Sequence, residues 1–149
     1  MKVSEIMTKD VTVVTTEMNA KEALDLLQKR EISGLPVMDA DKKLAGMFTE
    51  KEVIAAILPS YVERVGMFIY QENPKAVKQK VLMFSGIKVK DIMRKEVVTI
   101  DQDTTLCEVA RIMLTQKARR IPVLNKEKEV VGIVSRGEVV KALFQEYKG

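Results

Sequence analysis

The apolar residues of this chain follow two alternating spacings, and the same order of spacings occurs twice. Short β-branched runs at Val11–Val14 and Val97–Ile100 predict strands. After each run, apolar residues recur at i, i+3, i+4 and i+7, which indicates a helix with one buried face. These helical residues are Ala20, Ala23, Leu24 and Leu27, and then Leu106, Val109, Ala110 and Met113. Each half of the chain therefore predicts a strand followed by an amphipathic helix.

Polar residues mark the expected start of these helices. Asn19 is followed three residues later by Glu22, and Thr105 is followed in the same way by Glu108. In such a capping box, the first side chain accepts a hydrogen bond from the helix backbone, and the glutamate accepts one from the amide of the capping residue. We expect a capping box at the start of both helices.

Two more strands and a second helix complete each half. The predicted strands are Leu35–Met38 and Leu44–Phe48, matched by Ile121–Leu124 and Val130–Val134. Pro36 and Pro122 lack an amide donor, so each is expected to start a strand or to lie at a sheet edge. Gly46 and Gly132 lie inside strands, which suggests the close approach of another group. The final helices are predicted to begin at Thr49 and Ser135.

The two halves are copies of one unit. Residues 3–58 align with residues 89–144 without a gap, at a constant offset of 86 positions. A duplicated unit of this size is one supersecondary block that packs on its twin. Two similar halves create similar clefts between them, and such interfaces favour small-ligand sites. The sequence therefore predicts a first repeat at residues 1–58, a helical insert at 59–88 and a second repeat at 89–149.

The insert has no counterpart in the repeat. Tyr61–Tyr70 and Lys75–Phe84 carry partial apolar stripes and are separated by Asn73-Pro74, which predicts two helices. A linker helix that packs on the repeats explains these features. A dimer contact or a flap over a cleft is the alternative.

The composition narrows the class of protein. At 149 residues with 46% hydrophobic content, the chain has the size and apolar content of one ordinary domain. Its net charge of +4 is modest, and the basic residues between Lys75 and Lys95 are interrupted by apolar ones. This charge pattern is typical of a solvated face, and the absence of tryptophan also argues against nucleic-acid binding. No apolar run reaches membrane-spanning length, so no membrane partner is expected.

The single cysteine, Cys107, indicates the compartment. It cannot form an intramolecular disulfide, which fits a reducing cytoplasm. Because it lies in an apolar helical pattern, we expect a buried and unreactive thiol. The first residues lack the apolar core of a signal peptide. We therefore expect a cytoplasmic protein.

The residue types argue against an enzyme and against a metal site. The chain has no histidine, which removes the usual general base and the commonest metal ligand. It has no Cys/His cluster for zinc and no glycine-rich loop of the Walker or dinucleotide type. No pair of carboxylates or lysines stands out by its spacing. We expect neither catalysis nor a bound metal.

Three motifs, each present in both copies, carry a resemblance. They are Ile6-Met7-Thr8 with Ile92-Met93-Arg94, Leu35-Pro36-Val37-Met38 with Ile121-Pro122-Val123-Leu124, and residues 46–52 (GMFTEKE) with 132–138 (GIVSRGE). These segments resemble the patterns I-M-T/x, h-P-V-h and G-h-h-[TS]-x-x-D of the CBS domain family, in which h is an apolar residue. All three motifs occur twice, at the same offset of 86 positions, and this arrangement resembles a tandem CBS pair, or Bateman module.

The resemblance implies a fold and a range of ligands. It implies an α/β (α+β) fold of two tandem βαββα repeats packed about a pseudo-twofold axis, with two clefts between them. CBS pairs commonly bind AMP, ADP, ATP or S-adenosylmethionine in these clefts. They usually form homodimers shaped as a flat disc, and they usually regulate another protein.

The candidate ligand-binding residues follow from the resemblance and from what a nucleotide needs. Adenine needs an apolar slot, ribose needs hydrogen-bond acceptors and phosphate needs positive charge. In the first copy the candidates are Met7, Val11, Thr12, Ser33, Gly34, Pro36, Thr49 and Glu52. In the second copy they are Met93, Val97, Val98, Arg119, Arg120, Pro122, Ser135 and Glu138. In the family, the third motif supplies the ribose acceptor at its last residue and a phosphate contact at its Thr or Ser.

Both copies depart from the family at the ribose position. Glu52 and Glu138 stand where the family motif has aspartate. The longer side chain can still reach a ribose. Thr49 with Glu52 and Ser135 with Glu138 are also complete capping boxes, which need no ligand. Capping alone and nucleotide contact therefore stand as alternatives.

The two copies also differ in charge. Arg119 and Arg120 directly precede the second motif of the second copy. The nucleotide-binding gamma subunits of AMP-activated kinases place basic phosphate contacts at the matching positions. A guanidinium fork suits phosphate, although two adjacent arginines can also be a solvated pair. The first copy has Ser33 and Gly34 there, so we expect unequal sites with tighter phosphate binding near the arginines.

The sequence favours a regulatory function. The leading hypothesis is a non-catalytic module that binds an adenosyl ligand, needs no cofactor and acts as a homodimer on an unidentified partner protein. A ligand-free scaffold for dimerisation or protein interaction is the alternative, favoured by the two glutamates and by the lack of a fused effector domain. The apolar faces expected to serve a symmetric partner are Val53, Ile54 and Ile57, and Val139, Val140 and Leu143.

Overall fold

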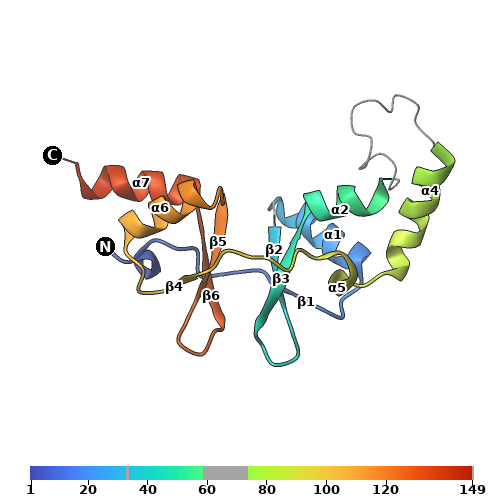
Figure 1. Cartoon of the computed structure of the whole chain (residues 1–149), viewed down its shortest axis with the longest axis horizontal. Helices are drawn as coiled ribbons and strands as arrows, with labels where there is room; N and C mark the ends of the chain where they lie inside the picture. Colours follow the sequence, from blue (N-terminus) through green and yellow to red (C-terminus); the bar gives the residue numbers. More distant parts are fainter. Residues whose placement is uncertain (33, 59–73, 149) are drawn as a thin grey trace. The chain divides into compact units, whose positions relative to one another are not determined.

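The chain folds into two compact units that do not follow the order of the sequence. The computed structural model describes residues 1–32, 34–58 and 74–148. One unit, here called the C-terminal unit, combines Met1–Thr12, Asp41–Leu44 and Glu96–Gly149. The other, the central unit, combines Val13–Ala40 and Ala45–Lys95. Each repeat contributes a three-stranded sheet with helices, which confirms the predicted α/β class with two repeats (Figure 1).

The central unit is built around the sheet β1-β2-β3. Its elements are β1 (Val14–Thr15), α1 (Ala20–Arg30), β2 (Gly34–Met38), β3 (Leu44–Thr49), α2 (Glu50–Ile57), α4 (Pro74–Met83), a 3₁₀ turn (Phe84–Gly86) and α5 (Val89–Ile92). Helix α1 buries Ala20, Ala23 and Leu27, as its spacing predicts. These side chains pack in one core with Phe48 of β3, which is fully buried.

The C-terminal unit repeats this plan around the sheet β4-β5-β6. Its elements are a 3₁₀ turn (Val3–Glu5), β4 (Ile100–Asp101), α6 (Leu106–Thr115), β5 (Arg120–Leu124), β6 (Val130–Ser135) and α7 (Arg136–Glu146). Helix α6 buries Leu106, Val109 and Met113 from the predicted stripe. Helices α6 and α7 lie side by side and cover one face of the sheet (Figure 1).

The prolines neither start a strand nor lie at a sheet edge, which corrects both positions expected for them. Strands β2 and β5 are central, and Pro122 is the third residue of β5, opposite Ile133 of β6. The first strand of the sheet, β4, pairs only with Val123 and Leu124. At Pro122 the strand therefore pairs on one side alone, and the missing amide donor leaves no gap in the ladder.

The same prolines shorten the first strands. The runs Val11–Val14 and Val97–Ile100 were expected to be strands, but β1 begins only at Val14 and β4 only at Ile100. Val14 lies opposite Val37, so the next pair toward the start of β1 would involve Pro36. Because proline has no N–H to donate, the parallel ladder ends there.

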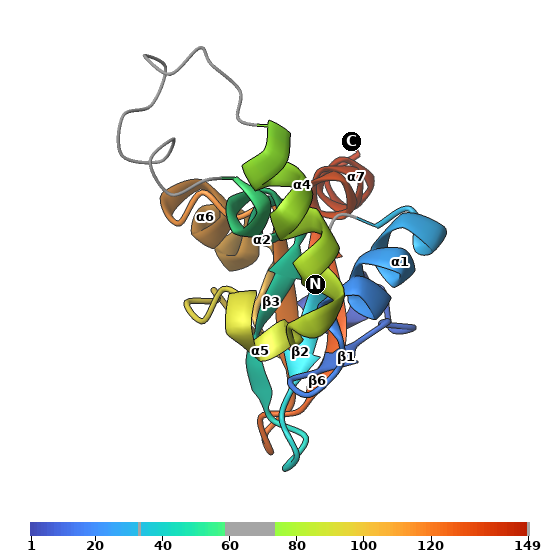
Figure 2. The ribbon, with the colours of Figure 1, turned by 90° about the vertical axis from the view of Figure 1, so that its right-hand side faces the viewer.

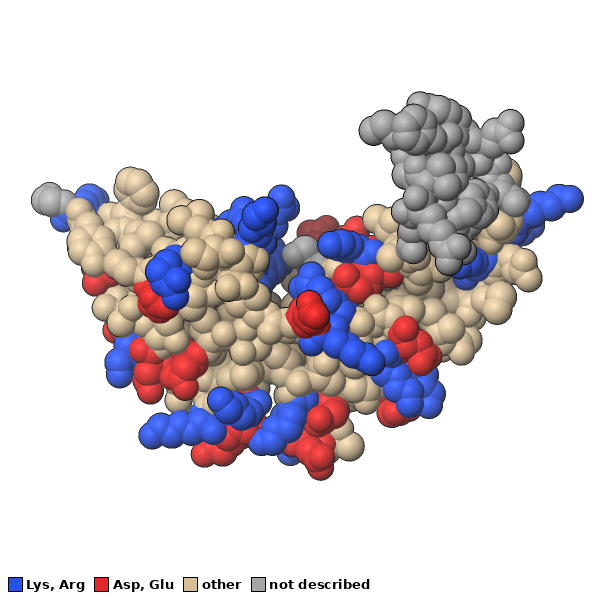
Figure 3. All heavy atoms as spheres, viewed as in Figure 1, with Lys and Arg blue, Asp and Glu red and all other residues tan. Residues whose placement is uncertain are grey.

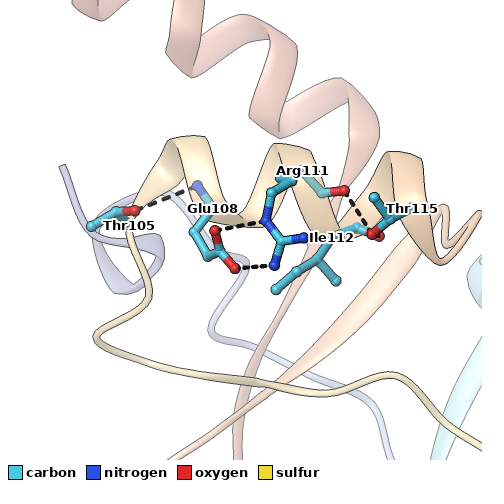
Figure 4. Close-up of polar contacts among 5 residues, drawn as sticks. All are labelled: Thr105, Glu108, Arg111, Ile112 and Thr115. Atoms are coloured by element: carbon cyan, nitrogen blue, oxygen red, sulfur yellow. Dashed lines mark hydrogen bonds and ion pairs between the residues drawn. The ribbon is translucent and has the colours of Figure 1, made fainter.

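The first helices are capped, but not by complete capping boxes. At α6, Thr105 Oγ1 accepts a hydrogen bond from Glu108 N at 3.4 Å. The Glu108 carboxylate does not complete the box by accepting a hydrogen bond from the backbone of Thr105. It accepts from Arg111 instead, whose Nε donates to Glu108 Oε2 at 2.9 Å (Figure 4). At α1, Asn19 Oδ1 accepts from Lys21 N at 2.8 Å. Both expected boxes are thus half formed, and at α6 the ion pair one turn along competes for the glutamate.

Each repeat contributes its first residues to the core of the other copy. Val3 is fully buried in the C-terminal core, and its amide donates to Thr104 O at 2.8 Å. Val89, its counterpart in the repeat, is fully buried in the central core, and its amide donates to Met18 O at 2.9 Å. The packing units therefore cut across the sequence repeats.

Ion pairs hold the exchanged segment of the central unit at its surface. Glu17 accepts hydrogen bonds from Lys88 Nζ at 2.6 Å and from Lys90 Nζ at 3.0 Å. These ammonium groups lower the pKa of Glu17, and the hydrogen bond to Glu17 raises the pKa of Lys88. All three side chains are exposed, so their contribution to stability is small.

The second helix predicted for the insert is present. Helix α4 begins at Pro74, a favoured first residue, and lies beside α2 (Figure 2). Phe84, just after α4, is buried in the central core. The other predicted helix, Tyr61–Tyr70, lies outside the described residues. No helix in the described ranges has the length and apolar content needed to cross a membrane.

Cys107 is exposed, which corrects the expectation of a buried thiol. It follows Leu106, a core residue of α6, by one position. One residue is a rotation of about 100° around a helix, so Cys107 faces away from the core. Its Sγ lies 3.9 Å from the hydroxyl of Tyr147, and this hydrogen bond raises the pKa of Tyr147.

Candidate functional site

The predicted site residues divide between the two compact units. This division differs from their division between the two sequence repeats. Those in the C-terminal unit are Met7, Val11, Thr12, Val97, Val98, Arg119, Arg120, Pro122, Ser135 and Glu138. Those in the central unit are Gly34, Pro36, Thr49, Glu52 and Met93. Ser33 lies outside the described residues. Met7 is therefore in one unit with the Ser135–Glu138 motif of the other copy, and Met93 is in one unit with the Thr49–Glu52 motif.

The exchanged methionines lie against the strand glycines. A Cβ atom on Gly46 would lie 2.9 Å from Met93 Sδ, and one on Gly132 would lie 2.8 Å from Met7 Cγ. The close approach expected at these glycines thus comes from the chain itself. Because Met7 and Met93 are half-buried in these contacts, part of each side chain stays accessible.

The Ser135–Glu138 motif forms a complete capping box at the start of α7. Glu138 Oε1 accepts hydrogen bonds from Ser135 N at 2.9 Å and from Ser135 Oγ at 3.0 Å. Glu138 Oε2 accepts a third from Thr8 Oγ1 at 2.8 Å. Sequence reasoning missed Thr8, although it belongs to the first motif. Both oxygens of this carboxylate therefore accept hydrogen bonds within the unit.

The Thr49–Glu52 motif forms the matching box at the start of α2, with one difference. Glu52 Oε1 accepts from Thr49 N at 3.0 Å and from Thr49 Oγ1. The counterpart of Thr8 is Arg94, and within the described residues Glu52 Oε2 accepts no hydrogen bond. One oxygen of this half-buried carboxylate therefore keeps its capacity as an acceptor.

A cavity of about 260 Å³ adjoins Glu52 in the central unit. Its lining residues are Lys51, Glu52, Ala55, Ala56 and Ile92. The alanines and the isoleucine provide an apolar surface, and the two charged residues provide polar groups beside it. This volume lies just below the usual range of about 300–1,000 Å³ for small-molecule sites, which are usually apolar with a few polar groups.

The predicted phosphate contacts are exposed in the C-terminal unit. Arg119 precedes β5 and Arg120 begins it, opposite Ser135 of β6. In the described part of the chain, neither side chain forms a hydrogen bond or ion pair. Arg136 lies beside them, because its amide donates to Arg119 O at 3.0 Å. Sequence reasoning missed Arg136, whose signal is that the aligned residue of the first copy is the oppositely charged Glu50.

The described residues contain no group of three or more His, Cys, Asp or Glu side chains arranged to hold a metal ion. The candidate chemistry is therefore that of hydrogen-bond acceptors in two capping boxes, an apolar cavity beside one of them, and three arginines beside the other.

Comparison with known proteins identifies the family. The model of the CBS domain matches residues 3–59 and again residues 89–145. The chain belongs to the CBS domain family. The resemblance predicted from the motifs is thus confirmed, and the two matches make the chain a tandem CBS pair.

The relatives of this CBS pair include proteins of the same kind and enzymes. CBSX1, a chloroplastic CBS domain-containing protein of Arabidopsis thaliana, is 34% identical over 151 residues, which cover 96% of this chain and 64% of that protein. The chain thus spans about two thirds of the length of this relative. Inosine-5'-monophosphate dehydrogenase of Methanocaldococcus jannaschii is 29% identical over 140 residues, which cover 94% of this chain but only 23% of the enzyme.

Solved structures of a CBS-pair protein match nearly the whole chain. CBSX2 from Arabidopsis thaliana has a TM-score of 0.78 and 26% identity, and the match covers 99% of this chain and 97% of that chain. A structure of CBSX2 in complex with AMP has a TM-score of 0.73 and 26% identity, and covers 97% of both chains. The chain therefore shares the CBS-pair fold of these structures.

Proposed function

We propose that this CBS pair is a non-catalytic regulatory module that binds an adenine nucleotide and passes this signal to a partner protein. The observation that carries the proposal is the match to CBSX2, which extends over nearly the whole length of both chains and includes a complex with AMP. No catalytic step is part of the proposal, because the chain has no histidine and the dehydrogenase relative matches over 23% of its length.

The two units offer different contacts to such a ligand. Among the described residues, Glu52 keeps one acceptor oxygen without a hydrogen bond beside an apolar hollow, which suits the hydroxyls of a ribose next to a base. Glu138 uses both oxygens for Ser135 and Thr8, and the arginines beside it suit phosphate. We therefore propose that the units are unequal, each with its own contacts: an acceptor oxygen beside an apolar hollow in the central unit and basic phosphate contacts in the C-terminal unit.

Binding is proposed to act through a population shift. A ligand that binds one conformation of the module more tightly than another favours that conformation by the difference in binding free energy. A partner protein that reads the conformation then responds to the nucleotide concentration. The proposal specifies the partner protein only by this ability to recognise one conformation of the module.

An adenine nucleotide is expected to stabilise the folded protein. A ligand at a hundred times its dissociation constant adds about 2.7 kcal/mol to the free energy of unfolding, because it binds only the folded state. Thermal unfolding followed by circular dichroism, with AMP, ADP, ATP and S-adenosylmethionine added separately, measures this effect. Inosine monophosphate is the matched control for recognition of the base.

The second candidate function is a ligand-free scaffold. The observation that favours it is that Glu52 and Glu138 already complete capping boxes within their own units. If none of the four ligands raises the melting temperature at millimolar concentration, the regulatory proposal fails and the scaffold takes its place.

We also propose that the module is a homodimer. Of the predicted apolar faces, Val53 and Val139 are buried within their units, whereas Ile54 and Val140 are 52% and 54% exposed. Phe144 of α7 and Tyr147, which directly follows its end, continue this exposed stripe, at 77% and 67%. Monomeric proteins rarely leave such a stripe uncovered, and a second copy can cover it with the same residues.

The homodimer predicts a defined response to mutation. Phe144→Lys is expected to convert the dimer to a monomer at tens of micromolar, because it places a charge in the apolar stripe. Gln145→Lys, one residue away on α7, is expected to leave the dimer intact. Sedimentation equilibrium measures the mass of each protein. A wild-type chain that is monomeric at this concentration would rule the dimer out.

A further inference from the structure

Helix α4 belongs to the insert and has no counterpart in the repeat. The repeat aligns residues 3–58 with residues 89–144, so α4 falls outside both copies. None of its residues is buried, although it lies beside α2. The packing of the two repeats therefore does not dictate which residues α4 exposes.

One side of α4 combines positive charge with apolar surface. Lys75, Lys78 and Leu82 are spaced i, i+3 and i+7, so their side chains lie along the same side of the helix. Leu82 is 67% exposed, and its neighbours Val81 and Met83 are 50% and 61% exposed. Figure 3 shows basic side chains over α4 at the right-hand edge, next to uncharged surface. We call Lys75, Lys78 and residues 81–83 the α4 surface.

The lysines of the α4 surface have no carboxylate partner among the described residues. Neither Lys75 nor Lys78 forms an ion pair there, and α4 contains no acidic residue. Lys88, at the end of the same insert, shows the alternative, because its Nζ pairs with Glu17 at 2.6 Å. The α4 surface thus presents positive charge that no neighbouring carboxylate balances.

Contacts elsewhere on α4 hold this surface in place. Phe84, directly after the helix, is buried in the central core. Lys80 Nζ donates to the carbonyl of Leu58, directly after α2, at 3.4 Å. A docking element that is already folded and anchored loses less conformational freedom when it binds. The α4 surface is therefore suited to recognition of another molecule.

We propose that the α4 surface is the docking site for the regulated partner protein, and that the partner's contact segment is an acidic amphipathic helix. The inference rests on the proposed function for the existence of a partner, and on α4 for its chemistry. Carboxylates on such a helix complement Lys75 and Lys78. Its apolar side chains cover Leu82 and the residues on either side, which removes their exposed surface from water.

The α4 surface suits this occupant better than a second copy or a membrane. A symmetric contact with a second copy would bring two basic faces together, which is repulsive. A helix that lies on a membrane needs one continuous apolar face. Val81, Leu82 and Met83 are consecutive instead, so they point in directions about 100° apart around the helix.

Helix α2 links the α4 surface to the cavity beside Glu52 within the same unit. Ala55 and Ala56 of α2 line that cavity, and the carbonyl that accepts from Lys80 belongs to Leu58, directly after α2. A ligand that favours one position of α2 therefore also favours one position of α4. Saturating AMP is expected to change the affinity of the α4 surface for an acidic helix about fivefold.

Fluorescence anisotropy at physiological salt tests the docking site. The probe is a labelled synthetic amphipathic helix with glutamate on its polar face and leucine on its apolar face, and the control peptide has glutamine in place of glutamate. Lys78→Glu is expected to weaken binding of the probe about tenfold, because attraction becomes repulsion. Leu82→Gln is also expected to weaken it about tenfold. Lys126→Glu, the same charge change at an exposed residue of the β5–β6 turn, is expected to stay within about twofold of wild type.

The outcomes separate this inference from the proposed function. If the probe binds with these losses while no adenine nucleotide binds, the docking site stands and the adenine-nucleotide function fails. If nucleotides bind but the probe does not, the docking site is wrong although the function stands. Equal losses in Lys78→Glu and Lys126→Glu, or equal binding of the glutamine peptide, would show non-specific attraction. Binding to vesicles of equimolar phosphatidylserine and phosphatidylcholine that Lys78→Glu abolishes, without binding of the probe, would assign α4 to a membrane. Either of these results overturns the docking site, and an affinity for the probe that AMP leaves unchanged overturns its link to the cavity.

Discussion

Gly46→Ala is expected to lower the free energy of unfolding by about 3 kcal/mol, at the upper end of the usual cost of overpacking. A Cβ atom at this position would lie 2.5 Å from the carbonyl oxygen of Arg94 and 2.9 Å from Met93 Sδ. The backbone of Arg94 cannot move aside easily, because it exchanges two hydrogen bonds of 2.9 Å with Met47. The substitution must therefore break this bridge or distort β3.

Other glycines provide the controls for this prediction. Gly86→Ala meets no atom within 4 Å, and Gly137→Ala, in α7, meets only Ser135 Oγ at 4.0 Å. Both are expected to be neutral or slightly stabilising, since alanine restricts the unfolded chain. Gly132→Ala is expected to cost less than Gly46→Ala, because the first atoms it meets belong to the flexible side chain of Met7. Urea unfolding curves for the four variants would contradict the account if Gly46→Ala fell within about 0.5 kcal/mol of Gly86→Ala.

Phe48→Ala is expected to cost about 3–5 kcal/mol, the range for truncating a buried aromatic residue. Phe48 is the largest fully buried side chain of the protein's described part, and it packs with α1 and β2 in the central core. The aligned residue in the C-terminal unit is Val134, which is also fully buried but smaller. Because the cost grows with the cavity that remains, Val134→Ala should destabilise less.

Comparison of these two core variants also tests the equivalence of the units. Denaturant unfolding followed by circular dichroism gives both losses of stability under the same conditions. A cost for Phe48→Ala equal to or below that for Val134→Ala would mean that the central core relaxes around the loss, and that its packing is looser than the burial of Phe48 indicates.

The elements that depend on local pattern could be predicted from the sequence. The i, i+3, i+4, i+7 spacing of α1 and α6 was enough, because the buried residues Leu27 and Val109 lie on the stripe that the spacing defines. The boxes at Thr49 and Ser135 were also predictable, because each needs only residues three positions apart. Cys107 was wrongly predicted to be buried, because its neighbours in sequence are apolar although it does not lie on the buried face of α6.

The exchange of segments between the copies could not be predicted from the pattern. Val3 and Val89 are identical, and so are Gly46 and Gly132, so packing within a copy and packing across copies satisfy the same motifs. The late start of β1 and β4 was also not predicted, because the residues that end the two ladders, Pro36 and Pro122, are on the neighbouring strands. Both errors arise from contacts between residues distant in sequence.

For the candidate site too, residues within one motif could be predicted, whereas contacts between residues distant in sequence could not. Glu138 was identified from its motif, but its bond to Thr8 joins residues 130 positions apart, which no local motif contains. Arg136 could not be grouped with Arg119 and Arg120 from the sequence, because it follows Arg120 by 16 positions. The strand register, which sets Arg136 beside Arg119, follows only from the fold.

The central claim, that this CBS pair binds an adenine nucleotide, is tested most directly by equilibrium dialysis of the wild-type protein against radiolabelled AMP and ATP. The account predicts saturable binding of both, displaced by the unlabelled nucleotide and not by inosine monophosphate. No saturable binding of either nucleotide at millimolar concentration would contradict it.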